Sequence, residues 1–270
     1  MDITGSSAFV SYDSILLQHD VPVRRAYVLL HGLTASPPQF AAFGRLLFDR
    51  GANVLIPRLP HHGYADRLTP ALRALTAEEL RVFAAANVER AASLADEVVV
   101  VGFSVGGLLA AWIGQRYPVA RVTAIAPFFG VAWLPGRLTS PLARIALVAP
   151  NRYLWWNPVL RGSLMPAHGY PRVPTHALAQ AAQLGQEVLR DAARVRPAAS
   201  DVQIVVNASE AAVSNATARD LARSWARSTG QRIVLHRLRG LPASHDIIEP
   251  ERNPDIVRRL YPALVDLVDR

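Results

Sequence analysis

The segment at residues 102–106, which reads Gly-Phe-Ser-Val-Gly, restricts the fold of this chain more than any other feature. It follows the apolar run at 98–101 and precedes the glycine, leucine and alanine residues at 107–111. Glycines on both sides of a serine allow the chain to turn sharply from a strand into a helix, and they leave the serine exposed on a strained turn. The sequence therefore predicts a buried strand, a tight turn and a buried helix, with Ser104 as the candidate nucleophile at the turn.

Apolar runs and helical patterns alternate on both sides of this turn. Strands that alternate with helices of ordinary length form βαβ units, whose right-handed crossovers build a mostly parallel sheet. We therefore expect an α/β fold with a central sheet flanked by helices. The expected strands are 26–30, 53–56, 97–101, 121–126, 202–206 and 232–238, and the expected helices are 39–49, 76–94, 104–117, 175–195, 216–229 and 254–269.

Residues 127–174 break this alternation, because they are rich in proline and large aromatic side chains. Single α/β domains commonly have about 200 to 250 residues, so a chain of 270 residues has room for one domain and an insertion. We predict a core made of residues 1–127 and 175–270, and an inserted cap at 128–174. The candidate residues of a substrate pocket are Phe103, Phe128, Trp133 and Trp155.

The composition, with 51% hydrophobic and 19% charged residues, is that of a globular chain. The formal net charge of +8 could attract nucleic acid or an anionic membrane, but the arginines are scattered instead of forming a block of like charge. We therefore expect neither a nucleic-acid partner nor stable membrane insertion. The uncharged stretch at 98–115 is about as long as a membrane span, but its glycines and Ser104 fit a buried strand and helix better.

The chain contains no cysteine, which excludes disulfides, thiolate catalysis and cysteine-ligated zinc. The first residues, 1–5, lack the basic region and the apolar core of a signal peptide, so we expect a cytoplasmic location. His61, His62 and His168 could supply metal ligands, but adjacent histidine rings point apart and no carboxylate cluster accompanies them. We therefore expect neither a metal nor another cofactor.

Acyl transfer to a serine passes through a tetrahedral intermediate, whose oxyanion needs backbone N–H donors. One donor comes from the residue after the nucleophile, and the other comes from an early strand-to-helix loop. Val105 fits the first position, and Leu33 in the loop at 31–35 fits the second. His31 in the same loop is expected to hold the loop by hydrogen bonds.

The general base is expected late in the chain, in the order serine, acid, histidine. His236 and His245 are the histidines of the last quarter. His236 lies within a predicted strand, whereas His245 lies in a loop after that strand, from which it can reach the turn. His245 is therefore the predicted general base.

The acid that orients this histidine should follow the predicted strand at 202–206. Glu210 is the carboxylate of the loop at 207–213, and it is the predicted acid. The alternative is a solvated loop glutamate, with the acid elsewhere. Asp201 precedes the strand, Asp220 falls in a predicted helix, and Asp246 is adjacent to the histidine.

Three motifs resemble those of a known family. The segment at 31–37 resembles a His-Gly-Phe-Thr-Gly-Ser-Pro loop, the segment at 58–63 is similar to a Pro-Gly-His-Gly segment, and the segment at 241–248 resembles a final histidine loop. Across residues 27–267 the chain resembles the α/β-hydrolase superfamily, and within it the cap-bearing bacterial carboxylesterases and monoacylglycerol lipases. That family usually has an Asp-x-x-Val pattern where Glu210 stands, although glutamate can fill the role.

This resemblance implies the α/β-hydrolase fold with a lid, and hydrolysis of carboxylic esters by a catalytic triad of Ser104, His245 and Glu210. An apolar, aromatic cap favours short or medium acyl chains and glyceride-like esters. The same triad could serve an amidase, an aminopeptidase or a thioesterase, because the fold does not fix the leaving group. A binding protein that keeps the fold without activity is the other alternative.

Overall fold

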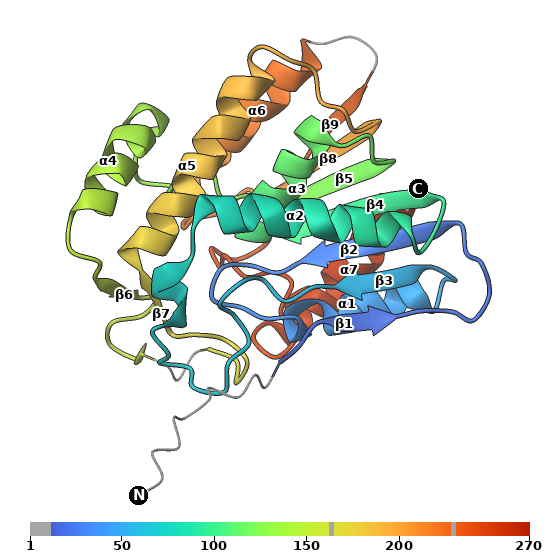
Figure 1. The fold of residues 1–270 in the computed structure, drawn as a ribbon, viewed down its shortest axis with the longest axis horizontal. Coiled ribbons are helices and arrows are strands. Elements are labelled where there is room, and N and C mark those ends of the chain that lie inside the picture. The colour runs from blue at the N-terminus through green and yellow to red at the C-terminus, as the bar shows by residue number, and fades with distance from the viewer. Residues whose placement is uncertain (1–11, 162–164, 228–230) are drawn as a thin grey trace, which may run out of the picture.

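The computed structural model describes residues 12–161, 165–227 and 231–270, and its centre is a seven-stranded sheet (Figure 1). The strands are β1 (Ile15–Leu17), β2 (Arg25–Leu30), β3 (Asn53–Ile56), β4 (Glu97–Phe103), β5 (Arg121–Ile125), β8 (Asp201–Asn207) and β9 (Arg232–Leu238). They lie in the order β1-β3-β2-β4-β5-β8-β9, and every neighbouring pair is parallel except β1 with β3. The predicted α/β fold with a mostly parallel sheet is therefore confirmed.

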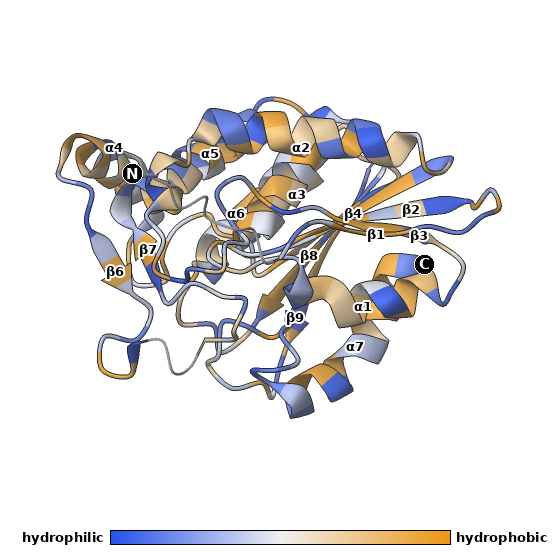
Figure 2. Cartoon of the chain, turned by 60° about the horizontal axis from the view of Figure 1, so that its bottom comes forward, coloured by the Kyte–Doolittle hydropathy of each residue, from blue (hydrophilic) through white to orange (hydrophobic). Residues whose placement is uncertain are grey.

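Helices cover both faces of the sheet, as the right-handed crossovers require. The helices of the core are α1 (Pro38–Phe48), α2 (Ala77–Ala92), α3 (Val105–Arg116), α5 (Thr175–Ala192), α6 (Asn215–Ala226) and α7 (Pro254–Asp269), and a short 3-10 helix spans Ala71–Ala74. α1 and α7 lie on one face, whereas α2, α3 and α6 lie on the other (Figure 2). α5 packs beside α2 and α3.

The start of α2 shows how the sequence sets a helix boundary. The hydroxyl of Thr76 accepts the backbone N–H of Glu79 at 3.1 Å, and the carboxylate of Glu79 accepts the backbone N–H of Thr76 at 2.9 Å. This capping box satisfies two N–H groups that the first turn of a helix leaves unpaired. It confirms the predicted start of the helix at this threonine.

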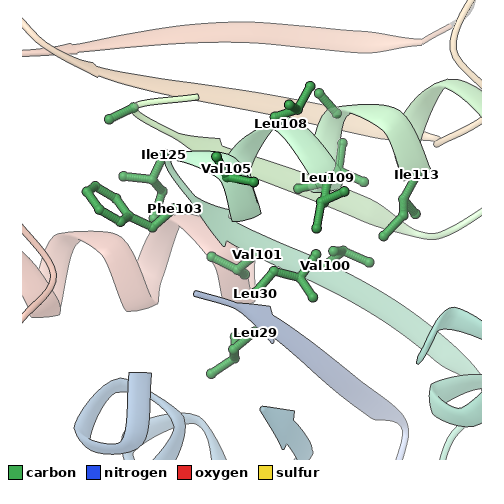
Figure 3. Close-up of a cluster of buried hydrophobic side chains, with 14 of the residues drawn as sticks. Leu29, Leu30, Val100, Val101, Phe103, Val105, Leu108, Leu109, Ile113 and Ile125 are labelled. Carbon is green, nitrogen blue, oxygen red and sulfur yellow. The ribbon is translucent and has the colours of Figure 1, made fainter. Parts of the chain in front are cut away.

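β4 and α3 form the centre of the hydrophobic core. Residues 98–103 of the strand and 105–115 of the helix are all buried. Figure 3 shows Val101 and Leu109 among the side chains that fill the space between β4, α3 and β2. Burial of a side chain of this size contributes about 1.5–3 kcal/mol to the stability of the fold. The strand and the helix on either side of the turn are therefore held in place by the core.

The uncharged stretch at 98–115 is therefore a strand and a helix inside the core, as predicted. Within the described residues, no helix combines the length and the apolar character that a membrane crossing requires.

Some element boundaries follow the prediction closely and others do not. β3, β9 and α7 have the predicted bounds, and β4 extends beyond the predicted strand to Phe103. β1 is not predicted, because three residues are too few to show an alternating pattern. Parts of three predictions lie outside the described residues: the N-terminal segment 1–5, the portion of the cap at 162–164, and the end of the helix at 228–229.

The chain forms a separate group of elements between β5 and α5. These are α4 (Gly136–Val148), β6 (Tyr153–Trp155) and β7 (Arg172–Pro174), and β6 pairs with β7 in the antiparallel direction. α4 packs along α5, and the group lies at one end of the molecule (Figure 1). The sequence does not predict α4, because Pro141 interrupts its helical pattern. The group falls within residues 128–174, whose role as a cap stays a prediction.

Candidate functional site

Ser104 stands at the turn between β4 and α3. Its φ of 57° and ψ of −114° are values that residues with a side chain rarely adopt. Its N–H donates to the carbonyl of Ile125 at 2.9 Å, and its carbonyl accepts the N–H groups of Leu108 at 2.9 Å and Phe128 at 3.0 Å. These three hydrogen bonds hold the strained backbone and thereby fix the position of the hydroxyl.

Gly102 and Gly106 are required by close contacts between backbones. A Cβ atom on Gly102 would lie 1.9 Å from the carbonyl oxygen of Gly106, and a Cβ atom on Gly106 would lie 1.9 Å from the carbonyl oxygen of Leu30. Backbone atoms cannot rotate away from such a contact. The glycines therefore allow β4, α3 and β2 to approach one another, in addition to permitting the turn.

His245 approaches Ser104 from the loop after β9. Its Nε2 lies 2.9 Å from Oγ of Ser104, and its Nδ1 lies 2.9 Å from Oε2 of Glu210. The structure therefore brings together the three predicted residues, which follow β4, β9 and β8 respectively. Parallel strands share one carboxyl edge, so residues that follow them can meet although 141 positions separate Ser104 from His245.

Glu210 faces His245 as a buried, fixed carboxylate. Its side chain is 0% exposed, and its Oε1 accepts the N–H groups of Ala212 at 2.7 Å and Val213 at 3.4 Å. Burial raises the pKa of Glu210, but the hydrogen bonds from His245 and from the backbone outweigh burial, so its pKa lies below the usual range. An ionised Glu210 accepts the Nδ1–H of His245, which leaves Nε2 to accept the proton of Ser104.

Three other residues that the sequence offers as acid or base have partners of their own. None of these three pairs involves Ser104 or His245. The pairs are Asp201 with Arg121, Asp220 with Arg223, and His236 with Gln203.

A second chain of hydrogen bonds connects the loop of His245 to the loop at 31–35. Oδ2 of Asp246 accepts a side-chain N–H of Gln39 at 2.9 Å, and Oε1 of Gln39 accepts the N–H of Gly32 at 2.8 Å. We call this contact the Gln39 bridge. Burial raises the pKa of Asp246, and Gln39 is also buried, in the first turn of α1. Sequence reasoning missed Gln39, because a glutamine within a helix carries no signal of its own.

Two buried histidines hold the loop at 31–35. Nε2 of His31 accepts the N–H of Leu59 at 3.1 Å, and Nε2 of His62 accepts the N–H of Thr34 at 3.1 Å. Each ring also donates from Nδ1 to a backbone carbonyl, at 2.9 Å for His31 and 2.8 Å for His62. Both nitrogens of each neutral ring are therefore used, in agreement with the structural role predicted for His31.

Leu33 lies in this loop, and Val105 opens α3 directly after Ser104. Both residues are nearly buried, at 8% and 1% exposure. The N–H of the first residue of a helix has no partner within its own helix, which makes that of Val105 available to a group bound beside Ser104. Their role as oxyanion donors belongs to the proposal below.

Acidification from pH 6.5 to pH 5 is expected to destabilise the protein through His62. Burial lowers the pKa of this ring to about 4 in the folded protein, whereas the unfolded chain has a pKa of about 6.5. The unfolded state therefore binds the proton first, so this contribution to stability is lost as the pH falls, by about 1.5 kcal/mol over this range.

Urea unfolding at the two pH values measures this loss. His62→Asn removes the titrating group, so its free energy of unfolding should fall less between the two pH values than that of the wild type. An equal fall in both proteins would contradict the assignment to His62.

Two of the four predicted pocket residues lie beside Ser104. The ring of Phe103 packs against the ring of His245, with 4.9 Å between centroids, and Phe128 donates its backbone N–H to Ser104. The side chain of Phe128 also lines an apolar cavity of about 190 Å³ between α4, β6 and α5. The other side chains that line this cavity include Leu142, Leu154 and Leu178.

The other two predicted pocket residues lie elsewhere. Trp133 is 80% exposed and lines a hollow against the start of α6. The ring of Trp155 lies beneath the guanidinium groups of Arg161 and Arg172, at 5.3 Å and 5.8 Å. The structure does not bring either tryptophan into contact with Ser104, and their pocket role stays a prediction.

The three histidines that could supply metal ligands have different partners. His61 lies 2.9 Å from a carboxylate oxygen of Glu79, while His62 binds the loop at 31–35. His168 lies 2.9 Å from a carboxylate oxygen of Glu249. These histidines therefore do not share one site, but His168 is accompanied by a carboxylate that the sequence did not reveal.

Sequence comparison relates most of the chain to a known family. A model of the alpha/beta hydrolase family matches residues 27–259. Esterase YjfP of Escherichia coli (strain K12) is 30% identical over 125 residues, a match that covers 39% of this chain and 50% of that protein. The match thus spans about half the length of this curated relative.

Solved structures resemble the whole chain. A monoacylglycerol lipase of Paleococcus ferrophilus has a TM-score of 0.72 at 17% identity, over 94% of this chain and 97% of that chain. A soluble variant of monoglyceride lipase from Saccharomyces cerevisiae has a TM-score of 0.71 at 13% identity, over 100% of this chain and 97% of that chain. At these identities the similarity shows the shared fold.

Proposed function

Because this chain belongs to the alpha/beta hydrolase family, we propose that it is a serine hydrolase that cleaves carboxylic esters through an acyl-enzyme intermediate. The observation that carries the proposal is the unbroken path of hydrogen bonds from Ser104 through His245 to Glu210, with 2.9 Å at both steps. Ser104 is the proposed nucleophile, His245 the general base, and Glu210 the acid that orients the histidine.

In the proposed acylation, Oγ of Ser104 attacks the ester carbonyl while Nε2 of His245 accepts the hydroxyl proton. The carbonyl oxygen becomes an oxyanion, for which the N–H groups of Leu33 and Val105 are the proposed donors. Collapse of the tetrahedral intermediate breaks the ester C–O bond, and His245 gives its proton to the departing alkoxide. Water, deprotonated by His245, then attacks the acyl-enzyme, and His245 returns that proton to Ser104 as the carboxylic acid leaves.

The environment of Glu210 supports this role. A buried carboxylate beside Nδ1 stabilises the imidazolium that forms when His245 accepts a proton, and the low local dielectric strengthens this attraction. The backbone bonds from Ala212 and Val213 hold the carboxylate in place, so it need not reorganise during the reaction. Glutamate has a longer side chain than aspartate, and at this position its carboxylate lies at hydrogen-bond distance from His245, at 2.9 Å.

The proposed substrates are esters with short or medium acyl chains, including glyceride-like esters. The apolar cavity next to Phe128 would accept an acyl chain, because its lining side chains are mainly aliphatic. Similar proteins described as an esterase and as monoacylglycerol lipases agree with an ester substrate. Residues 128–174 contain no aspartate or glutamate that could bind a substrate amine, which favours an ester over a peptide.

Covalent labelling with a fluorophosphonate probe tests this function. The wild type is expected to react, because such a probe traps an activated serine, whereas Ser104→Ala should neither react nor hydrolyse nitrophenyl esters. Ser93→Ala, which removes an exposed hydroxyl outside the site, is the matched control and should behave as the wild type.

A folded wild type that resists the probe would contradict the proposal and favour a binding protein with this fold. If the wild type reacts with the probe, a panel of nitrophenyl esters from acetate upward defines the acyl length that the enzyme prefers. Faster turnover of thioesters or amides than of esters would contradict the proposed substrate class while leaving the roles of the three residues intact.

A further inference from the structure

A cluster of three potential metal ligands lies outside the proposed active site. His168, Glu249 and Glu251 place one ring nitrogen and two carboxylate oxygens within 4.8 Å of one another. The histidine comes from the segment that leads into β7, and both glutamates come from the loop between β9 and α7. Histidine nitrogen and carboxylate oxygen are ligands that zinc and other first-row divalent ions accept.

Three buried side-chain atoms of this cluster, Nδ1 and Nε2 of His168 and Oε2 of Glu249, have no hydrogen-bond partner among the described residues. The side chains of His168 and Glu249 are only 4% and 2% exposed. Nε2 of His168 lies 2.9 Å from Oε2 of Glu249, but their mutual angle does not suit a hydrogen bond, so both atoms remain without one, as does Nδ1. Buried polar atoms are nearly always hydrogen-bonded. A ligand bound between the two side chains would satisfy the two facing atoms, Nε2 of His168 and Oε2 of Glu249.

A second buried carboxylate lies next to this cluster. Glu249 and Asp246 are both buried, and Oδ1 of Asp246 accepts the backbone N–H of Glu249 at 3.0 Å, which places the two carboxylates close together. In the described part of the chain, His168 is the one basic group within ion-pair distance of Glu249, and Glu251 has no basic partner. A divalent ion would balance these carboxylates.

Neighbouring contacts hold the two buried ligands in position. The hydroxyl of Ser36 donates to the carbonyl of His168 at 2.9 Å, and the ring of Tyr12 lies edge-on to the ring of His168 at 5.9 Å. The N–H of Glu251 binds Oε1 of Glu249 at 3.2 Å, so Oε2 stays directed at the histidine. Ligands that are already ordered lose little conformational entropy when an ion binds.

We propose that His168, Glu249 and Glu251 form a binding site for a divalent transition-metal ion such as Zn²⁺, with water as the fourth ligand. Zinc binds these ligands at about 2.0–2.2 Å, which places neighbouring ligand atoms of a tetrahedral site roughly 3.3–3.6 Å apart. Small side-chain shifts therefore suffice to admit the ion, and the exposed Glu251 gives it a route from solvent. The bound ion would connect the end of the insertion to the loop that follows His245.

Zinc binding by the full-length protein tests this site. After treatment with EDTA and desalting, titration with Zn²⁺ against a chromophoric chelator is expected to show one equivalent bound. Zinc at about 100 times its Kd is expected to raise the Tm by roughly 5 °C. Neither measurement requires a substrate, so the result does not depend on the function proposed for Ser104.

Variants identify the ligands. His168→Gln, Glu249→Gln and Glu251→Ala should each lower zinc affinity at least about tenfold, since even groups that only support metal ligands contribute 10–100-fold. Glu251 is exposed, so Glu251→Ala should fold even if the buried variants do not. His61→Asn is the matched control, because His61 pairs with Glu79 at 2.9 Å in a cluster of two.

Retained affinity in His61→Asn, together with loss in Glu251→Ala, would support the site. Absence of zinc binding by the wild type would overturn it, and so would wild-type affinity in Glu251→Ala. A similar loss in His61→Asn would assign the zinc to another place and would equally overturn the proposal.

Discussion

Glu210→Gln is expected to lower kcat for a nitrophenyl ester by about 10⁴-fold, with a much smaller change in KM. Glutamine keeps the size of the side chain, but its amide presents an N–H to Nδ1 of His245 in place of a carboxylate oxygen. The imidazole proton then moves to Nε2, and this tautomer cannot accept the proton of Ser104. Steady-state kinetics of the purified variant measure the effect.

Asp220→Asn is the matched control for this substitution. It removes the charge of a carboxylate whose side chain is 67% exposed and pairs with Arg223, so it should leave kcat within about twofold of the wild type. Glu210→Asp keeps the charge but shortens the reach of the side chain to His245. Its kcat should therefore lie between that of Glu210→Gln and that of the wild type. Turnover by Glu210→Gln within a few-fold of the wild type would show that another group orients the histidine.

Gly106→Ala is expected to leave little folded protein. The added Cβ atom would lie 1.9 Å from the carbonyl oxygen of Leu30 and 2.7 Å from that of His31. Overpacking costs about 1–3 kcal/mol where side chains can adjust, but these are backbone atoms of β2 and its loop. The clash should therefore remove most of the roughly 5–15 kcal/mol that stabilises a domain. Soluble yield, near-ultraviolet circular dichroism and urea unfolding measure the outcome.

Gly51→Ala separates this clash from the cost of backbone conformation. Gly51 has a φ of 89°, but a Cβ atom placed there meets nothing within 4 Å. The substitution should cost only about 1–2 kcal/mol, the strain of a side chain in the left-handed region. If Gly106→Ala were as stable as Gly51→Ala, the result would contradict the close contact between α3 and β2 at Gly106.

The sequence predicts the part of the site that depends on local patterns. The run at 97–101 and the glycines around Ser104 indicate a strand, a turn and a helix from the sequence of this segment alone. His245 and Glu210 can be predicted because each follows a strand of the same parallel sheet, and parallel strands bring such loops to one edge. The structure then joins Glu210 to His245 and His245 to Ser104, at 2.9 Å in each pair.

Other features could not be predicted, because they depend on contacts between distant segments. α4 contains a proline that obscures its helical pattern, and its packing along α5 is visible only in the folded chain. His168 and Glu249 belong to different parts of the chain, and nothing in either segment indicates that they lie 2.9 Å apart. Gln39 connects two loops by hydrogen bonds, and this role becomes visible only when the fold places its side chain between them.

The Gln39 bridge aligns the two loops because the side-chain amide of Gln39 is both a hydrogen-bond donor and an acceptor. A glutamine amide offers N–H at one end, which suits Asp246, and an oxygen at the other end, which suits the N–H of Gly32. Glutamate at this position would set a second carboxylate against Asp246, and lysine would offer no acceptor to Gly32. A replacement that is tolerated elsewhere on a helix would therefore break the connection between the loop of Leu33 and the loop of His245, although the bonds of Gln39 go to the neighbouring residues Gly32 and Asp246.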